Sequence, residues 1–331
     1  MIASEIQPYI ESGHVKAYPN GELTLYHYTR KATVERKWDW PIRQCRGLVL
    51  DNYGAVVARP WPKFFNLGEI PETFPENIPN EVPELSEKYD GSLIICFYYM
   101  GNWQCVTSGC WDNVQTQWAK RWLCDYSDRL SPMMTYLFEL VAPWNQIVVR
   151  YPTEKMILIG IVDPVTGVDL PYCQVRTQAQ IMRLTPVEYH YSPISTFDKT
   201  LKTEREGYVA RYSNGLRVKM KYDAYIALHK VITGLSIIGI WEHLANGSPE
   251  PELPNEFRDW YKTERGKLID AYGRLECRAK TLLEGYQMRG SRKWYAERFN
   301  QYPELAPILF RMLDNKPYSD VIWRKVKPRG D

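Results

Sequence analysis

The chain has 331 residues, the length of one large domain or of two ordinary ones. Its hydrophobic content of 44% and charged content of 24% are those of a globular protein that can bury its own core. The net charge of +3 is too small to attract nucleic acid over the whole surface, so any such site must be a local patch.

The cysteines and the N-terminus bear on the kind of protein expected. Seven Cys and five His are scattered without a C-x-x-C pair, so we expect no zinc cluster, and the odd number favours reduced thiols. Residues 1–5 lack the basic and apolar segments of a signal peptide, and apolar runs such as 156–162 are too short to span a bilayer. We therefore expect a soluble, cytoplasmic protein without a membrane partner.

The first two thirds of the chain are rich in predicted strands. Alternating apolar residues and turn residues predict three hairpins and one buried strand. The turn residues Asn214-Gly215 supply the positive φ that a tight hairpin needs. The hairpins are expected at 47–50 with 55–58, at 92–99 with 103–107 and at 206–212 with 216–220, and the buried strand at 156–162.

Helical periodicity and loop residues complete the expected organisation. Helices are predicted around 113–124, 177–184 and 223–244, and prolines at positions 71, 75, 79 and 83 predict an extended loop. The Pro-rich segment 248–254 predicts a domain boundary, followed by a helical region. We therefore predict an α+β domain of antiparallel sheets with flanking helices over residues 1–247, and a small all-helical domain over residues 248–331.

The sharpest local feature is the segment Glu87-Lys88-Tyr89-Asp90-Gly91-Ser92, in which a lysine precedes Asp-Gly at the start of an apolar strand. On its own, K-x-D-G is a weak signal, because a surface turn with a solvated lysine would look the same. Its neighbours strengthen it. In chain order they are Cys45-Arg46-Gly47, Lys63-Phe64-Phe65-Asn66, Phe138-Glu139-Leu140, Glu206-Gly207-Tyr208-Val209 and Lys219-Met220-Lys221.

In this order and at these intervals, the segments resemble the covalent nucleotidyltransferases, which include polynucleotide ligases and mRNA capping enzymes. The nearest resemblance is to the RNA ligase 1 family, the bacteriophage tRNA-repair type of ATP-dependent RNA ligase, and it covers about residues 40–230. The resemblance implies a nucleotidyltransferase fold, ATP as the AMP donor, and an RNA partner with 5′-phosphate and 3′-hydroxyl ends, single-stranded or tRNA-like. Gln146 stands where this family commonly has an arginine, and this departure concerns the substrate and not the adenylation step.

The chemistry requires a neutral lysine amine that attacks the α-phosphate of ATP, although a free lysine is almost fully protonated near pH 7. Lys88 is the expected nucleophile, and it would form a lysyl–AMP intermediate. Lys219 and Lys221 alternate on one predicted strand, so they share a face and can stabilise the charge that develops on the phosphate. The alternative for this pair is a solvated basic strand.

The resemblance also assigns the carboxylates and the remaining cations. Glu139 would contact the nucleotide sugar or help to bind metal, and Glu206 would orient a hydrated Mg²⁺ or Mn²⁺, with Asp90 either assisting or only capping its turn. Glu139 could instead be a strand-edge residue that faces solvent.

Arg46 and Lys63 would contact the phosphates of ATP or the 5′-phosphate of RNA, unless they are solvated surface cations. Tyr225 would join them, unless it is a core residue at the start of a helix. The expected cofactor-binding set is therefore Arg46, Lys63, Lys88, Glu139, Lys219, Lys221 and Tyr225.

The C-terminal region has no recognisable motif. Residues 287–331 contain ten Lys or Arg against five Asp or Glu, with interleaved aromatic residues, which suits contact with RNA or an ordinary amphipathic helical domain. We predict an ATP-dependent RNA ligase whose helical domain helps to select RNA. The alternatives are a DNA ligase, a GTP-dependent capping guanylyltransferase and a noncatalytic RNA-binding protein on a ligase scaffold. The oligomeric state is not predicted.

Overall fold

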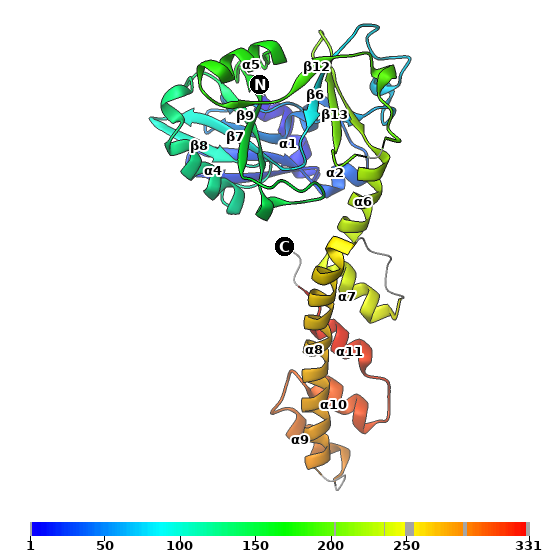
Figure 1. Ribbon diagram of the computed structural model, residues 1–331. Coiled ribbons are helices and arrows are strands. Elements are labelled where there is room, and N and C mark those ends of the chain that lie inside the picture. The colour runs from blue at the N-terminus through cyan, green and yellow to red at the C-terminus, as the bar shows by residue number, and fades with distance from the viewer. Residues whose placement is uncertain (1, 202, 235, 249–254, 287–289, 329–331) are drawn as a thin grey trace. The chain divides into compact units, whose positions relative to one another are not determined.

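The structure is a computed structural model that describes residues 2–201, 203–234, 236–248, 255–286 and 290–328 (Figure 1). The chain divides into two compact units, residues 1–228 and residues 229–331. The first unit is a mixture of antiparallel sheets and helices, as predicted for an α+β fold, and the second unit is helical.

The first sheet has four strands in chain order, each antiparallel to its neighbour. One face packs against short helices around a core that includes Ile6, Ile42 and Leu48. The strands are β1 (Val15–Asn20), β2 (Leu23–Tyr28), β3 (Arg46–Asp51) and β4 (Val56–Ala58), and the helices are α1 (Ile2–Glu11), α2 (Arg30–Val34) and α3 (Trp40–Gln44).

The second sheet has the order β11-β10-β9-β7-β8 and is antiparallel except for the β10–β11 pair. One face packs against the first sheet, because Leu25 and Val49 share an apolar cluster with Phe97 and Leu137. The other face is covered by helices α4 and α5. The elements are β7 (Ser92–Tyr99), β8 (Asn102–Val106), α4 (Val114–Cys124), β9 (Thr135–Val141), β10 (Lys155–Val162), α5 (Tyr172–Ile181) and β11 (Thr185–Pro186).

The third sheet has the order β12-β6-β13-β14-β5. Its register places Lys88 on β6 beside Gly207 on β13, and Gly207 beside Lys221 on β14. Three predicted site segments therefore meet at one end of this sheet. The strands are β5 (Phe65–Asn66), β6 (Glu84–Lys88), β12 (Tyr189–Tyr191), β13 (Gly207–Arg211) and β14 (Arg217–Lys221), and 3₁₀ turns occur at Pro71–Thr73, Ser127–Arg129, Pro143–Asn145 and Ile194–Thr196.

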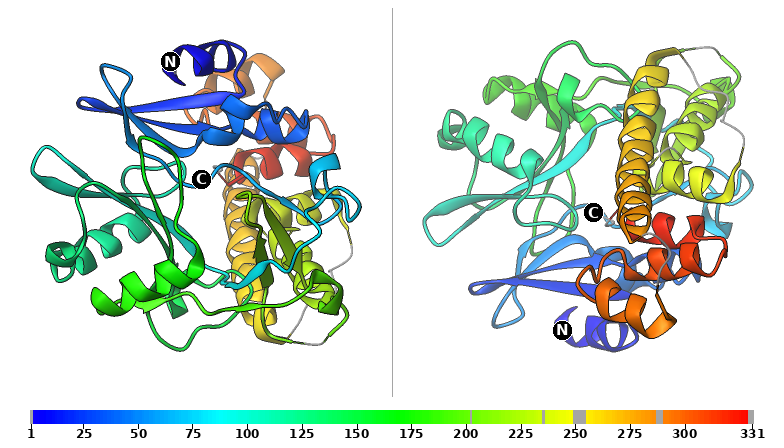
Figure 2. Two further views of the ribbon diagram at one scale, coloured as in Figure 1. Left: turned by 90° about the horizontal axis from the view of Figure 1, so that it is seen from above. Right: turned by 90° about the horizontal axis from the view of Figure 1, so that it is seen from below.

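The second unit is built on the long helix α8, which α7, α10 and α11 contact along its length (Figures 1 and 2). Phe299, Leu305 and Ile308 are fully buried in its core. The helices are α7 (Ile237–Asn246), α8 (Asn255–Gly285), α9 (Arg292–Phe299), α10 (Ala306–Leu313) and α11 (Ser319–Lys325), and α6 (Asp223–Gly234) runs from the first unit into the second.

The three predicted hairpins and the buried strand are all present, as is the predicted helix at 113–124. Two predictions need correction: α5 begins earlier than expected, at Tyr172, and the single helix expected over 223–244 is the two helices α6 and α7. The hairpin β1–β2 was not predicted. The boundary expected after residue 247 falls within the second unit, at the end of α7, and residues 249–254 lie outside the described residues. The domain assignment of residues 1–247 and 248–331 stays a prediction.

No helix in the described ranges is both long enough and apolar enough to cross a membrane.

Candidate active site

The K-x-D-G segment connects the third sheet to the second, because β6 ends at Lys88 and β7 begins at Ser92. Gly91 lies against the backbone of β9, where an added Cβ would collide with the carbonyl oxygen of Leu140. Only glycine allows this approach without movement of the strand. The glycine therefore fixes the angle at which the lysine leaves its strand.

Asp90 anchors this connection from the inside. Its side chain is buried, and its Oδ2 accepts hydrogen bonds from the backbone N–H groups of Val148 at 2.7 Å and Val149 at 2.8 Å. Its Oδ1 accepts a hydrogen bond from the hydroxyl of Tyr225 at 2.8 Å. Of the two roles expected for Asp90, this geometry favours holding the turn rather than binding a metal. The side chain of Tyr225 is buried and contacts Asp90 through this hydrogen bond.

Lys88 and Lys221 share one carboxylate. Nζ of Lys88 lies 2.7 Å from Oε2 of Glu206, and Nζ of Lys221 lies 2.7 Å from Oε1 of the same residue. The carboxylate is 2% exposed, whereas about a fifth of each lysine side chain is exposed, at 22% and 23%. The two ammonium groups are thus held on either side of a buried anion with their outer faces open to a pocket.

That pocket is lined by most of the predicted site residues. The lining combines cations and carboxylates with apolar side chains. It includes Arg46, Glu87, Lys88, Glu139, Lys219 and Lys221, together with Trp61, Phe64, Ile159, Tyr172 and Val209. Cations suit phosphate groups and apolar walls suit an aromatic base, so the composition fits a nucleotide.

Lys219 lies deep in this pocket. Burial lowers the pKa of its amine well below the usual range, and the nearby charges of Arg46, Lys63, Lys88 and Lys221 lower it further. Its Nζ lies 4.7 Å from the ring centre of Phe64, and the guanidinium of Arg46 lies 5.6 Å from the same ring. The Phe64 ring therefore offers a cation–π contact to each of these two side chains. An anionic ligand would relieve the repulsion that remains.

Glu139 projects from β9 toward the same charges. Burial raises the pKa of its carboxyl to about 7, the Glu206 carboxylate also raises it, and the Lys88 ammonium opposes the rise. Its Oε1 accepts a hydrogen bond from the backbone N–H of Gly91 at 3.2 Å. Glu139 can therefore exchange a proton near neutral pH.

The structure places Lys63 beside a neighbouring cavity and not among the residues that line the first pocket. Its Nζ is surrounded by the rings of Tyr28, Trp38 and Phe65, at 4.7–5.5 Å from their centres. Burial lowers the pKa of this amine as well. Trp61 and Phe64 line both cavities and form a common wall.

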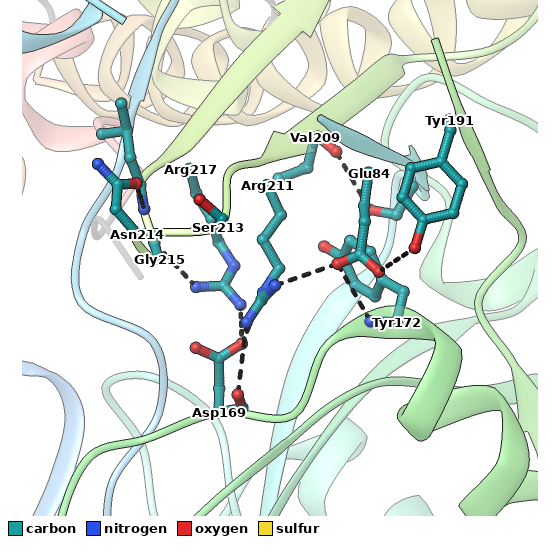
Figure 3. Close-up of polar contacts among 12 residues, drawn as sticks. Glu84, Asp169, Tyr172, Tyr191, Val209, Arg211, Ser213, Asn214, Gly215 and Arg217 are labelled. Atoms are coloured by element: carbon teal, nitrogen blue, oxygen red, sulfur yellow. Dashed lines mark hydrogen bonds and ion pairs between the residues drawn. The ribbon is translucent and has the colours of Figure 1, made fainter. Parts of the chain in front are cut away.

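The other end of β13 and β14 is held by buried ion pairs (Figure 3). Arg211 pairs with Glu84 and with Asp169, each at 3.1 Å, and Arg217 pairs with the same Asp169. The Arg217 guanidinium also lies 4.1 Å from the ring centre of Trp61. This network fixes the strand that carries Lys219 and Lys221. It was not predicted from the sequence, because the partners are distant in the chain.

The described residues contain no group of three or more His, Cys, Asp or Glu side chains placed to hold a metal ion. A complete protein cage of Asp90, Glu139 and Glu206 is therefore not formed. Glu139 lines the pocket, and the buried Glu206 contacts the pocket lysines Lys88 and Lys221. Mg²⁺ commonly takes one or two carboxylates together with substrate phosphates and water. The donor set fits a cation of this kind only together with a bound nucleotide.

A sequence model of a family described as RNA ligase matches residues 44–225, which is more than half of the chain and includes every predicted site residue. The chain belongs to this RNA ligase family. The match covers the second and third sheets and strands β3 and β4 of the first sheet, and it ends at Tyr225, in the first turn of α6.

Two curated relatives of this RNA ligase family member are similar over part of their length. A candidate RNA ligase of Thermovibrio ammonificans is 34% identical over 156 residues, covering 44% of this chain and 41% of that protein. A candidate bifunctional polynucleotide kinase/RNA ligase of Autographa californica nuclear polyhedrosis virus is 27% identical over 259 residues, covering 65% of this chain and 35% of that protein. The chain thus spans about two fifths or less of these relatives.

Solved structures with similar folds include RNA ligases. An archaeal ATP-dependent RNA ligase is 13% identical with a TM-score of 0.48, covering 98% of this chain and 78% of that one. An RNA ligase of Naegleria gruberi, determined as a mutant with ATP and manganese, is 14% identical with a TM-score of 0.38, covering 46% of this chain and 52% of that one.

Several lining residues were not singled out from the sequence as site residues. Trp61 and Phe64 were visible in the segment around Lys63, but their position on a shared wall depends on the fold. Ile159, Tyr172 and Val209 looked like ordinary core residues, and no local pattern separates an apolar pocket wall from a core.

Proposed function

We propose that this protein is an ATP-dependent RNA ligase that joins RNA 5′-phosphate and 3′-hydroxyl ends through a lysyl–AMP intermediate on Lys88. The observation that carries the proposal is the sharing of Glu206 by Lys88 and Lys221 in a pocket that also contains Lys219, Arg46 and Glu139. Membership of the RNA ligase family supports the same reaction.

The first step is attack by Lys88 on the α-phosphate of ATP. The amine must first lose a proton, and the Glu206 carboxylate at 2.7 Å is placed to accept it. A bond then forms between Nζ and phosphorus while the bond to the pyrophosphate oxygen breaks, and pyrophosphate leaves. Lys219, Lys221 and Arg46 hold the phosphate and stabilise the charge that develops on it.

The next two steps transfer AMP and seal the strand. An oxygen of the RNA 5′-phosphate attacks the phosphorus, the Nζ–phosphorus bond breaks, and RNA capped with AMP through a 5′–5′ pyrophosphate is formed. The 3′-hydroxyl of the other end then attacks the RNA phosphate, AMP leaves, and a phosphodiester is formed. The same cations serve each step by positioning successive phosphates in one place.

A divalent cation, Mg²⁺ or Mn²⁺, would be held by Glu206 or Glu139 together with nucleotide phosphate oxygens, and when bound it neutralises phosphate charge. The Asp90 carboxylate is not included, because its oxygen atoms are held by Val148, Val149 and Tyr225, whereas an oxygen of Glu206 is released when the Lys88 amine bonds to phosphorus. We propose tRNA-like or other single-stranded RNA as the substrate, with the helical second unit contributing to its selection.

The test is incubation of the full chain with ATP labelled at the α-phosphate, in parallel with labelled GTP, in the presence of Mg²⁺. We expect ATP alone to label the protein, and the label to disappear in Lys88→Ala but not in Lys16→Gln, which removes an exposed amine on β1. Labelling by GTP alone would favour a capping enzyme, and labelling by neither would favour a noncatalytic RNA-binding protein.

A second assay examines the substrate. Wild-type protein with ATP and 5′-phosphorylated single-stranded RNA should produce circles, and Lys88→Ala should join only a strand that has been adenylated in advance. Sealing of nicked duplex DNA without action on RNA would identify a DNA ligase instead.

A further inference from the structure

The second cavity, next to the proposed adenylation pocket, carries a set of groups that the first step of the reaction does not use. The residues that line it include Trp40, Arg43, Lys63 and Arg217, together with the shared wall of Trp61 and Phe64. All of them belong to the first unit. The lining contains three cations and one carboxylate, Glu72, so the cavity favours an anion.

Two buried donors on this lining have no hydrogen-bond acceptor within the part of the chain that the structure describes. Nε of Arg217 and Nε1 of Trp61 are buried without a hydrogen-bond partner, and the side chain of Arg217 is 5% exposed. The other nitrogens of this guanidinium bind Asp169 and the carbonyl of Gly215 (Figure 3). Both nitrogens have almost no solvent-accessible surface, so they make this wall of the cavity polar without contacting a ligand directly, and the positive charge of the Arg217 guanidinium is what an anion in the cavity would meet.

Trp40 supplies the other kind of contact. It is the first residue of α3 and is 62% exposed, although tryptophan is usually well buried. An exposed aromatic ring beside cations is what single-stranded nucleic acid uses for base stacking and phosphate contact. Arg43, on the same helix, is held in place by the carbonyl of Trp38 at 2.7 Å and by Glu72 at 2.6 Å.

We propose that the second cavity binds a nucleotide of the RNA strand to be joined, with its base stacked on Trp40 and its phosphate held by Arg43, Lys63 and Arg217. This inference rests on the proposed ligase function. The shared wall of Trp61 and Phe64 places this nucleotide directly beside the adenylation pocket. An open stacking surface suits a strand that must leave after sealing, whereas the apolar walls of the first pocket suit the adenine of ATP.

The proposal is tested by the affinity of the full chain for a fluorescein-labelled, 5′-phosphorylated single-stranded RNA, measured by fluorescence anisotropy. Trp40→Ala should weaken binding about tenfold, and Trp40→Phe should restore most of it. Tyr53→Ala removes another exposed aromatic ring, on the β3–β4 turn, and should leave the affinity unchanged. An equal affinity in Trp40→Ala and wild type would overturn the proposal.

The salt dependence of the RNA affinity is a second measurement, and a loss of packing alone would not change it. Arg43→Gln should reduce the slope of log affinity against log salt concentration by about 0.7, the amount for one phosphate of a single strand. Trp40→Ala and the surface control Lys16→Gln should leave the slope unchanged. An unchanged slope in Arg43→Gln would contradict the phosphate contact.

Labelling by ATP separates the two possible sources of the phosphate. If the cavity instead holds the terminal phosphates of ATP, Trp40→Ala and Arg43→Gln will raise the KM for ATP in labelling and leave the RNA affinity unchanged, which overturns the proposal. If the variants weaken RNA binding although the wild-type protein takes no label, the cavity assignment stands and the proposed ligase function fails.

Discussion

The Nζ atom of Lys88 lies 2.7 Å from Oε2 of Glu206. Lys88 is the last residue of β6, and Glu206 immediately precedes the neighbouring strand β13. The other oxygen of Glu206 binds Lys221 at the same distance. Because the carboxylate is buried and both lysines reach the pocket, Glu206 controls the position of the nucleophile and of one phosphate-binding cation together.

Glu206→Gln should therefore slow labelling of the protein by ATP by about a hundredfold or more. The neutral amide can accept from only one lysine through its oxygen, and it cannot take the proton that Lys88 must lose. We also expect the free energy of unfolding to fall by about 2 kcal/mol, because charged hydrogen bonds are lost. Labelling rates and urea unfolding measure the two effects.

The matched control for this variant is Glu76→Gln, which changes an exposed carboxylate in the Pro-spaced segment. It should alter neither labelling nor stability. If folded Glu206→Gln were labelled at the wild-type rate, Glu206 would have only a structural role.

Glu139 should make stability depend on pH. Its pKa is raised from 4.5 to about 7 in the folded protein, so the folded state binds the extra proton and stability falls as pH rises through this window. This group alone should lower the free energy of unfolding by about 3 kcal/mol between pH 4.5 and pH 7. The unfolding free energy of the wild type minus that of Glu139→Gln should therefore fall by about 3 kcal/mol when the pH is raised from 4.5 to 7. A difference that is equal at both pH values would contradict the assignment.

Asp90 offers a test between an anchoring role and a metal-binding role. Asp90→Ala leaves the backbone N–H groups of Val148 and Val149 without their acceptor and should cost about 3 kcal/mol of stability. Asp90→Asn keeps an oxygen for both groups and should stay within about 1 kcal/mol of wild type. Chemical denaturation measures both variants.

The Mg²⁺ concentration that gives half-maximal labelling should be the same in Asp90→Asn and in wild type. A metal ligand needs the negative charge of the carboxylate, so a marked increase in that concentration would restore Asp90 to the metal site.

The sequence was informative where chemistry requires a particular residue type at a particular spacing. Lys88, Glu206, Lys219 and Lys221 were identified from short segments, and the structure brings all four together. The alternation of Lys219 and Lys221 around Met220 also predicted their shared face, since Met220 is buried on the opposite side.

Features that depend on distant partners were not accessible from local patterns. The pairing of Arg211 and Arg217 with Asp169 joins β13 and β14 to a loop more than forty residues earlier, at separations of 42 and 48 positions. The separation of Lys63 from the first pocket likewise depends on how Phe64 and Trp61 divide two cavities. A resemblance can name such residues, but only the fold shows which cavity they face.

Gly207 follows Glu206 directly, and its backbone sets where that carboxylate points. Its φ of +147° is in the region that favours glycine, and an added Cβ would collide with the carbonyl oxygen of Met220 on β14. Gly207→Ala should therefore push β13 and β14 apart beside Lys221, lower the free energy of unfolding by about 2 kcal/mol or more, and abolish labelling by ATP.

Gly266→Ala is the matched control, because Gly266 lies inside α8 with open space around its Cα. This substitution should leave labelling unchanged and stabilise the helix by up to about 1 kcal/mol. Unfolding monitored by circular dichroism compares the two variants. Wild-type stability and labelling in Gly207→Ala would show that the approach of the two strands does not constrain Glu206, and the assignment of this glycine would then be wrong.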